Sequence, residues 1–213
     1  MPKGYVTVSE AAQRMPVPRS PFDGHPAADH PNVAGQIGVR LQAGILPGVM
    51  QVSTWIRGVA GLEQALAAWL GAPPPGPTGQ TLHTAQGLLM RTGPEEWLLV
   101  AEQAGEHTAL LRRQVAADVG AVTDLSHARC RIRIEGQRCR DTLSKLYALD
   151  LRDAAFPVGQ VRLTGHHHVP ALLHRTGVDG FDIYVFTTYA LDHLHALEDA
   201  ALEYGVAVQA GAG

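Results

Sequence analysis

The densest set of groups that could do chemistry is a run of three histidines, His166-His167-His168. Imidazole nitrogens are common zinc ligands, and a zinc site needs its ligands to converge on one point. If the run lies on a strand, the middle side chain points to the opposite face from its neighbours, which leaves only two imidazoles on one side. No neighbouring cysteine or carboxylate completes a tetrahedron. We therefore expect a polar strand or loop end here and predict no metal site.

Five arginines within twelve residues form the most basic stretch of the chain. A guanidinium group binds a carboxylate or a phosphate through two parallel hydrogen bonds, so such a cluster suits an anion or an acidic protein surface. Two interpretations stay open: contact with a partner subunit or an anion, and a solvated sheet face paired with Asp118, Asp124 or Asp141. No recognisable nucleic-acid motif accompanies the cluster. The candidate subunit-interface residues are Arg129, Arg131, Arg133, Arg138 and Arg140.

Asp124, Ser126 and His127 have the residue types of a nucleophilic triad, but their spacing argues against one. Neighbours in an extended segment point to opposite faces, and triads are assembled from distant segments around an oxyanion hole. The chain also has no G-x-S-x-G nucleophile elbow. We expect Asp124 and Ser126 to form hydrogen bonds with the backbone where a strand begins.

The remaining candidates also favour structural roles. Glu95 and Glu96 could act as paired carboxylates, but adjacent acids at a turn are usually solvated, and we expect Trp97 to enter the core. The spacing of Cys130 and Cys139 fits no metal or redox pattern, so both are predicted to be buried free thiols. Glycine-rich phosphate loops and dinucleotide fingerprints are absent. The sequence thus predicts no catalytic, cofactor-binding or metal-ligating residue in this chain.

The arginine cluster belongs to a unit, residues 122–151, that is predicted to run from strand through turn to helix. Apolar and charged residues alternate through 130–135, which is the period of a strand with one apolar and one charged face. Gly136 interrupts this pattern, and helical spacing follows it. The rest of the chain is predicted to cover the apolar side of this unit. The expected apolar face of the helix consists of Cys139, Leu143, Leu146 and Tyr147.

Strands followed by a helix recur along the chain, which predicts an α+β fold with antiparallel sheets and two similar lobes, about 33–117 and 118–213. We find no residue motif shared by the two halves, so a repeat has weak support. Residues 1–32 are rich in proline, and we expect an extended arm outside the core with one helical turn at 9–12. Strands are predicted at 37–41, 50–56, 88–90, 97–100, 130–135, 161–163, 169–173 and 183–186, and helices at 62–70, 108–117, 139–147 and 188–204.

Composition limits the class of protein. The 213 residues carry a net charge of −3 with a pI of about 6.4, which argues against a general nucleic-acid binder. No apolar run approaches the ~20 residues of a membrane span, and the first residues lack the apolar core of a signal peptide. Two unpaired cysteines fit a reducing compartment. We expect a cytoplasmic protein that binds neither membrane nor nucleic acid.

Several stretches together resemble the gamma subunits of heterotetrameric sarcosine oxidases. The resemblance spans roughly residues 20–204, and its motifs are more specific together than any one of them alone. The matching motifs are Gly93-Glu96-Trp97, Asp124-Ser126-Arg129, Gly136-Leu143-Lys145, Leu149-Asp150-Leu151, Phe156-Pro157-Gly159, Leu172-Leu173-His174-Arg175 and Phe181-Asp182-Tyr184-Val185.

This resemblance implies a fold like the folate-binding aminomethyltransferase domain of the glycine cleavage system. It also implies a non-catalytic role in assembly, beside alpha, beta and delta subunits. In that family the larger subunits hold NAD, FAD, FMN and tetrahydrofolate and oxidise an N-methyl amine, while the gamma subunit holds no cofactor. The alternative is a stand-alone folate-binding or aminomethyltransferase-like protein, for which we can assign no pocket residue.

Overall fold

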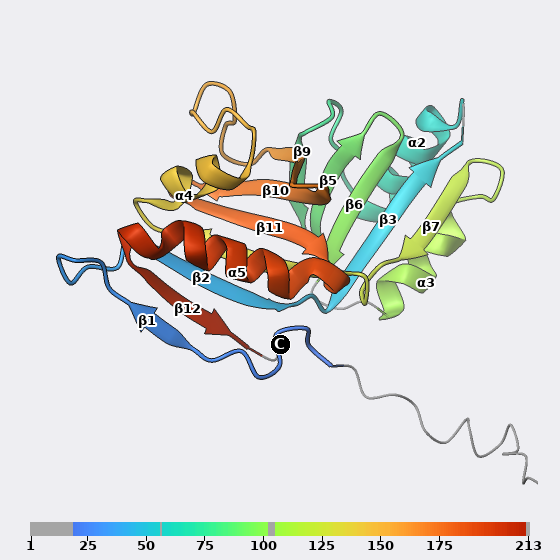
Figure 1. The fold of residues 1–213 in the computed structure, drawn as a ribbon. Coiled ribbons are helices and arrows are strands. Elements are labelled where there is room, and N and C mark those ends of the chain that lie inside the picture. The colour runs from blue at the N-terminus through green and yellow to red at the C-terminus, as the bar shows by residue number, and fades with distance from the viewer. Residues whose placement is uncertain (1–18, 56, 102–104, 212–213) are drawn as a thin grey trace, which may run out of the picture.

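The computed structural model describes residues 19–55, 57–101 and 105–211, which form two β-sheets with helices on their outer faces (Figure 1). Helices α4 and α5 cover one sheet, and α2 and α3 cover the other. The larger sheet has the order β1(Ala28–His30), β12(Val206–Ala210), β2(Val39–Ile45), β8(Arg129–Glu135), β11(Gly180–Phe186), β10(Val169–Gly177) and β9(Val161–His166). The smaller sheet has the order β4(Thr81–Thr84), β5(Gly87–Gly93), β6(Glu96–Ala101), β3(Gly48–Thr54) and β7(Gly120–Asp124). The helices are α2(Val59–Leu70), α3(Gly105–Gln114), α4(Cys139–Leu146) and α5(Ala190–Ala201).

Three apolar clusters follow from this layering. One lies between the larger sheet and α4 and α5, and a second lies between the smaller sheet and α2 and α3. The third joins the inner faces of the two sheets, where Met90 and Leu98 meet Leu172 and Tyr184. The α+β fold with mainly antiparallel sheets is therefore confirmed.

The chain passes through the same order of elements twice. β3-α2-β4-β5-β6-α3-β7 is followed by β8-α4-β9-β10-β11-α5-β12. The sheet orders also correspond, β4-β5-β6-β3-β7 in the first unit and β9-β10-β11-β8-β12 in the second, except that β2 is inserted between β8 and β12. We refer to these as the first unit (48–124) and the second unit (129–210).

Sheet membership does not follow the expected division at residue 118. Strand β2 comes from the first half of the chain but pairs with β8 and β12, and β7 comes from the second half but pairs with β3. The order of predicted strands along the chain gives no information on which distant strands pair, so this exchange could not be read from it.

The two units share a residue motif, contrary to the prediction that they share none. Leu-Leu-Met-Arg-Thr-Gly at 88–93 corresponds to Leu-Leu-His-Arg-Thr-Gly at 172–177, and each ends in a bulge before the return strand. A second match, Pro-x-Gly-Gln, occurs at 77–80 and at 157–160. The two Pro-x-Gly-Gln loops meet, since Gln80 and Gln160 form an isolated antiparallel bridge.

The described part of the 1–32 segment is integrated into the larger sheet rather than lying outside the core. Phe22 is 2% exposed within the cluster under α5, and β1 pairs antiparallel with β12, with Ala28 opposite Val208. The Nε2 atom of His25 lies 3.0 Å from a carboxylate oxygen of Glu198 on α5. The helical turn predicted at 9–12 lies outside the described residues. Three further strands, β4, β7 and β12, were also missing from the prediction.

The predicted strand–turn–helix unit is confirmed as β8 and α4. Cys130, Ile132 and Ile134 are buried against the helices while the intervening arginines are half-buried on the other face. Gly136 has φ +121°, and a Cβ there would lie 2.4 Å from the carbonyl oxygen of Gly38, so only glycine fits this turn. At the other end of the chain, the helix predicted over 188–204 is α5 flanked by 3-10 turns, and no side chain caps its start.

Candidate functional site: the arginine face of β8 and the intersheet cavity

The inner face of β8 holds three of the five predicted interface arginines, and their partners differ. Arg133 forms a two-pronged ion pair with Asp182, which lies directly opposite on β11: Nε donates to Oδ1 at 2.7 Å and Nη2 to Oδ2 at 2.9 Å. This bond to the buried carboxylate raises the pKa of Arg133. Arg131 comes no closer to Asp182 than 4.0 Å, and the Arg129 guanidinium lies 3.7 Å above the Phe186 ring.

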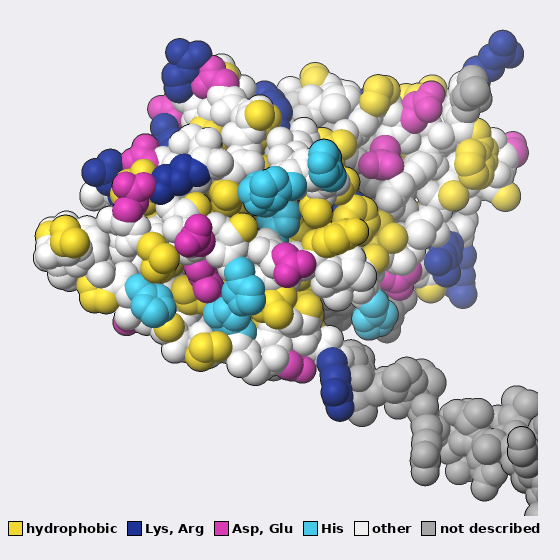
Figure 2. All heavy atoms as spheres, in the orientation of Figure 1, with side chains coloured by type: hydrophobic (Ala, Val, Ile, Leu, Met, Phe, Trp, Pro, Cys, Tyr) yellow, Lys and Arg dark blue, Asp and Glu magenta, His cyan; other side chains and the backbone are white. Residues whose placement is uncertain are grey.

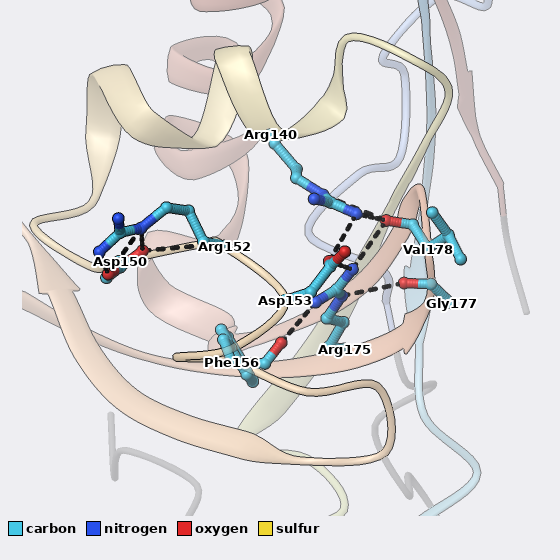
Figure 3. A network of polar contacts seen from close by, with 8 residues as sticks. All are labelled: Arg140, Asp150, Arg152, Asp153, Phe156, Arg175, Gly177 and Val178. Atoms are coloured by element: carbon cyan, nitrogen blue, oxygen red, sulfur yellow. Dashed lines mark hydrogen bonds and ion pairs between the residues drawn. The ribbon is translucent and has the colours of Figure 1, made fainter.

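The other two arginines lie apart from this face. Arg138 forms an exposed ion pair with Asp141 at 2.8 Å, which is one of the pairings considered for a solvated face. Arg140 donates to the carbonyl oxygen of Val178 and lies 3.1 Å from a carboxylate oxygen of Asp153 (Figure 3). The five arginines therefore occupy three separate places. Their role as subunit-interface residues stays a prediction.

Arg175 is a structural residue whose role we did not predict. It is 1% exposed, and its guanidinium donates to the backbone oxygens of Phe156, Gly177 and Val178 and to the carboxylate of Asp153 (Figure 3). These bonds fix the loop that follows α4 and the β10–β11 turn in one place. Four of the five N–H donors of this buried guanidinium are therefore used within the fold.

Arg91 occupies the corresponding position in the first unit. It donates to the backbone oxygens of Gly93 at 3.4 Å and Pro94 at 2.7 Å and to Glu63 at 2.8 Å. Its guanidinium lies 4.4 Å from the centre of the Trp97 ring, as that of Arg175 lies 5.8 Å from the Phe181 ring. The repeated Arg-Thr-Gly in the sequence is the signal that would have identified both residues.

A cavity of about 780 Å³ opens between the two sheets beside β8. Arg131 and Arg133 reach it from β8, and Asp182 and His174 reach it from the neighbouring strands. The remaining polar lining includes His83 and Thr84 of β4. Its apolar wall includes Ile45, Leu46, Pro47, Leu88, Val100 and Val158.

His174 is the most unusual group in this cavity. Its side chain is 2% exposed, and neither ring nitrogen has a hydrogen-bond partner among the residues that the structure describes. The pKa of His174 is lowered to about 4, mainly by burial; Asp182 opposes this shift, and His83 and Arg133 add smaller contributions to it. The imidazole is therefore neutral at pH 7 and offers one donor and one acceptor.

The histidine run forms a turn. β9 ends at His166, and His167 and His168 connect it to β10, with His167 at φ +52°. The run is thus at a strand end, as we expected. Because it does not continue along one strand, His167 does not face away from His166, and their ring centres lie 4.1 Å apart. Among the described residues no group of three or more side chains is placed to hold a metal ion. Histidines lie beside hydrophobic side chains on the face that carries α5 (Figure 2).

Two of the other expectations are only partly met. Asp124 bonds to the backbone as expected, but at the end of β7 rather than where a strand begins, and Glu96, which we expected to be solvated, is hydrogen-bonded within the fold. Asp124 accepts hydrogen bonds from the backbone N–H of Ser126 at 2.9 Å and from its hydroxyl at 2.6 Å, and these bonds lower the pKa of Asp124. Glu96 accepts from Thr92 and from Gln51, both at 2.7 Å. Trp97 is fully buried, as are the free thiols of Cys130 and Cys139. In the parts of the chain that the structure describes, no helix has the length and apolar character needed to span a membrane.

Comparison with known proteins gives consistent results. The family model of the GCVT N-terminal domain matches residues 78–212. The sarcosine oxidase subunit gamma of Corynebacterium sp. (strain U-96) is 31% identical over 67% of this chain and 70% of its own length. The subunit gamma from Arthrobacter sp. is 30% identical over 70% of this chain and 73% of its own length.

Solved structures show the same relationship. A chain of the heterotetrameric sarcosine oxidase from Corynebacterium sp. U-96 matches with a TM-score of 0.72 and 29% identity, over 81% of this chain and 88% of that one. The aminomethyltransferase T of the glycine cleavage system from Bartonella henselae shares the fold, with a TM-score of 0.53 and 18% identity over 82% of this chain and 48% of that one. The chain therefore belongs to the family of sarcosine oxidase gamma subunits and has the GCVT N-terminal fold.

Proposed function

We propose that the chain is the accessory, non-catalytic gamma subunit of a heterotetrameric oxidase or dehydrogenase that acts on sarcosine or another N-methyl amine. The observation that carries this proposal is the match to a chain of heterotetrameric sarcosine oxidase over 81% of this chain and 88% of that one. Because the match covers nearly all of a chain that is already part of an assembly, it supports a similar place in a similar assembly.

The bonding of the described polar groups supports a structural contribution. The acids that could have acted as a base or a nucleophile are held by neighbours, Asp124 by Ser126 and Glu96 by Thr92 and Gln51. Arg91 and Arg175 are likewise committed to backbone oxygens of their own loops. These groups rigidify the two units, which is what an assembly subunit requires.

The partners under this proposal are the alpha, beta and delta subunits, in the cytoplasm. Those subunits would hold FAD, FMN, NAD and tetrahydrofolate, oxidise the N-methyl group and pass its carbon to folate. The gamma subunit would contribute by docking on the large subunit and holding it rigid.

Among the five candidate interface arginines, Arg138 is the best placed for docking. Its side chain is 57% exposed, and it lies apart from the cavity that Arg131 and Arg133 line. Arg129 lies on an aromatic ring and Arg140 is bonded to a loop carbonyl oxygen, so both are more committed to their own fold. A carboxylate of the large subunit would bind the exposed Arg138 guanidinium.

Co-expression with the three candidate partner subunits tests the assembly. A tagged chain should co-purify with all of them, and Arg138→Glu should lower the recovered complex several-fold because it places like charges together. Arg113→Glu, which makes the same charge change on the exposed side of α3, serves as the control. Failure to co-purify, or full assembly and turnover without this chain, would contradict the proposal.

The isolated chain provides the second test. It should neither oxidise sarcosine nor retain flavin in stoichiometric amount. Calorimetry with tetrahydrofolate addresses the alternative of a stand-alone folate-binding protein, since micromolar binding by the isolated chain would favour that alternative.

A further inference from the structure

The two units differ at one pair of facing positions on their inner faces. In the first unit Met90 lies opposite Leu98, and in the second unit His174 lies opposite Asp182 at the same register. Met90 and Leu98 are packed in the intersheet core, while His174 and Asp182 line the cavity. An apolar pair is thus sufficient for this architecture, so the polar pair needs an explanation other than the fold.

Burying His174 without a partner is unfavourable. A buried polar group that lacks its hydrogen bond costs about 1–3 kcal/mol, and here both ring nitrogens lack one. The side chain lines a cavity of about 780 Å³, within the range of small-molecule sites. A ligand in this cavity could supply the missing partner.

The charges around the cavity indicate the sign of that ligand. Asp182 neutralises Arg133 through the two-pronged ion pair, whereas Arg131 has no hydrogen bond among the described residues and only the 4.0 Å approach to Asp182. The charges of Arg133 and Asp182 cancel, so the net charge of these three side chains is the single positive charge of Arg131. A carboxylate could accept from Arg131 and from the N–H of neutral His174.

The shape of the cavity indicates the rest of the ligand. Ile45, Leu46, Leu88 and Val158 form an apolar wall next to the polar groups. A ligand with a carboxylate at one end and an apolar body would match both surfaces. We propose that the intersheet cavity is a binding site for an amphipathic carboxylate, whose carboxylate lies between Arg131 and His174.

Isothermal titration calorimetry on the full chain with two probes of the same shape tests this proposal. Phenylacetate carries the carboxylate, and phenylacetamide is its neutral counterpart. Three variants accompany the wild type. Arg131→Gln removes the free charge, His174→Met introduces the residue of the first unit, and Arg40→Gln removes an exposed arginine of β2 outside the cavity.

We expect phenylacetate to bind about tenfold or more tightly than phenylacetamide. Arg131→Gln and His174→Met should each weaken phenylacetate binding about tenfold, and Arg40→Gln should leave it within about twofold. Equal affinity for the two probes, no phenylacetate binding at about 10 mM, or unchanged affinity in Arg131→Gln would each overturn the proposal. If His174→Met fails to fold, Arg131→Gln still tests the proposal. This variant should fold, because among the described residues Arg131 makes no hydrogen bond that the change would break.

Discussion

The first and second units use the same device to close their loops. In each unit a buried arginine follows the shared Leu-Leu-x sequence, Arg91 in β5 and Arg175 in β10. The N–H of the preceding Pro-x-Gly-Gln glycine donates to the carbonyl oxygen of that arginine, at 2.8 Å in both units. Gly79 and Gly159 have φ +90° and +80°, values that favour glycine. Positions that close a loop are thus the ones that match between the units.

The inner faces of the two units are where they diverge. The first unit has the apolar pair Met90 and Leu98, and the second has His174 and Asp182, with Arg133 completing an ion pair. Both pairs occupy equivalent register in otherwise equivalent hairpins. The same backbone arrangement therefore forms whether this face is apolar or polar, so the polar side chains of the second unit can take part in binding without a change of fold.

The largest expected effect comes from removing the shared arginine. Arg175→Met should lower the free energy of unfolding by about 3–5 kcal/mol, because it leaves the buried backbone oxygen of Phe156 without its donor and leaves Val178 and Asp153 with Arg140 alone. Arg91→Met should cost a similar amount if the two units are equivalent. Urea denaturation measures both.

Arg152→Met is the matched control for these two variants. Arg152 is 85% exposed and, among the described residues, pairs with Asp150 (Figure 3), so its loss should leave the free energy of unfolding close to that of the wild type. A cost for Arg175→Met as small as that of the control would show that the arginines do not hold the loops.

Acid should destabilise the protein through the polar inner face of the second unit. His174 has a pKa of about 4 when folded, against about 6.5 when unfolded, so the unfolded chain binds the proton more readily. This contribution to stability is present above pH 6.5 and is lost as the pH falls towards 4, by up to about 3 kcal/mol. Chemical denaturation at several pH values should show the loss.

His174→Met should reduce this acid sensitivity, because methionine does not titrate. His193, whose pKa burial also lowers to about 4, remains in the variant and retains part of the effect. A difference between wild type and variant that stays constant from pH 7 to about pH 4.5 would contradict the assignment to His174.

The smallest expected effect is the change in the free energy of unfolding that His174→Met produces at neutral pH. His174→Met gives the second unit the residue of the first and removes two unpartnered buried nitrogens, so the free energy of unfolding should rise by about 1 kcal/mol. Thermal unfolding at pH 7.5 measures this change. A clear loss of stability would indicate that His174 has a partner or a packing role of its own.

Local features of the fold could be predicted from the sequence. The alternation in β8 and the helical spacing after Gly136 follow from residue order alone, and both are confirmed. Cys130 and Cys139 are buried as their surroundings indicated. The resemblance on short motifs identified the family because several of them mark loop and turn positions with strict geometry.

Long-range pairing could not be predicted in the same way. Asp182 in an apolar strand signals a paired carboxylate, but its partner Arg133 lies 49 residues away and only the strand register brings them together. The cavity depends on the packing of two sheets, which no local pattern encodes. The equivalence of Arg91 and Arg175, by contrast, could have been predicted, because both arginines follow Leu-Leu-x and precede Thr-Gly in the sequence.

The insertion of β2 between β8 and β12 has a consequence for synthesis on the ribosome. β2 ends at Ile45 and its neighbour β8 begins at Arg129, 84 positions later, so the strand is translated long before either partner exists. At 5–20 residues per second the delay is roughly 4–17 s. During that interval the apolar face of Val39, Leu41 and Ala43 lacks the helices α4 and α5 that cover it in the folded protein, so we expect chaperones that shield extended hydrophobic segments to bind the nascent chain.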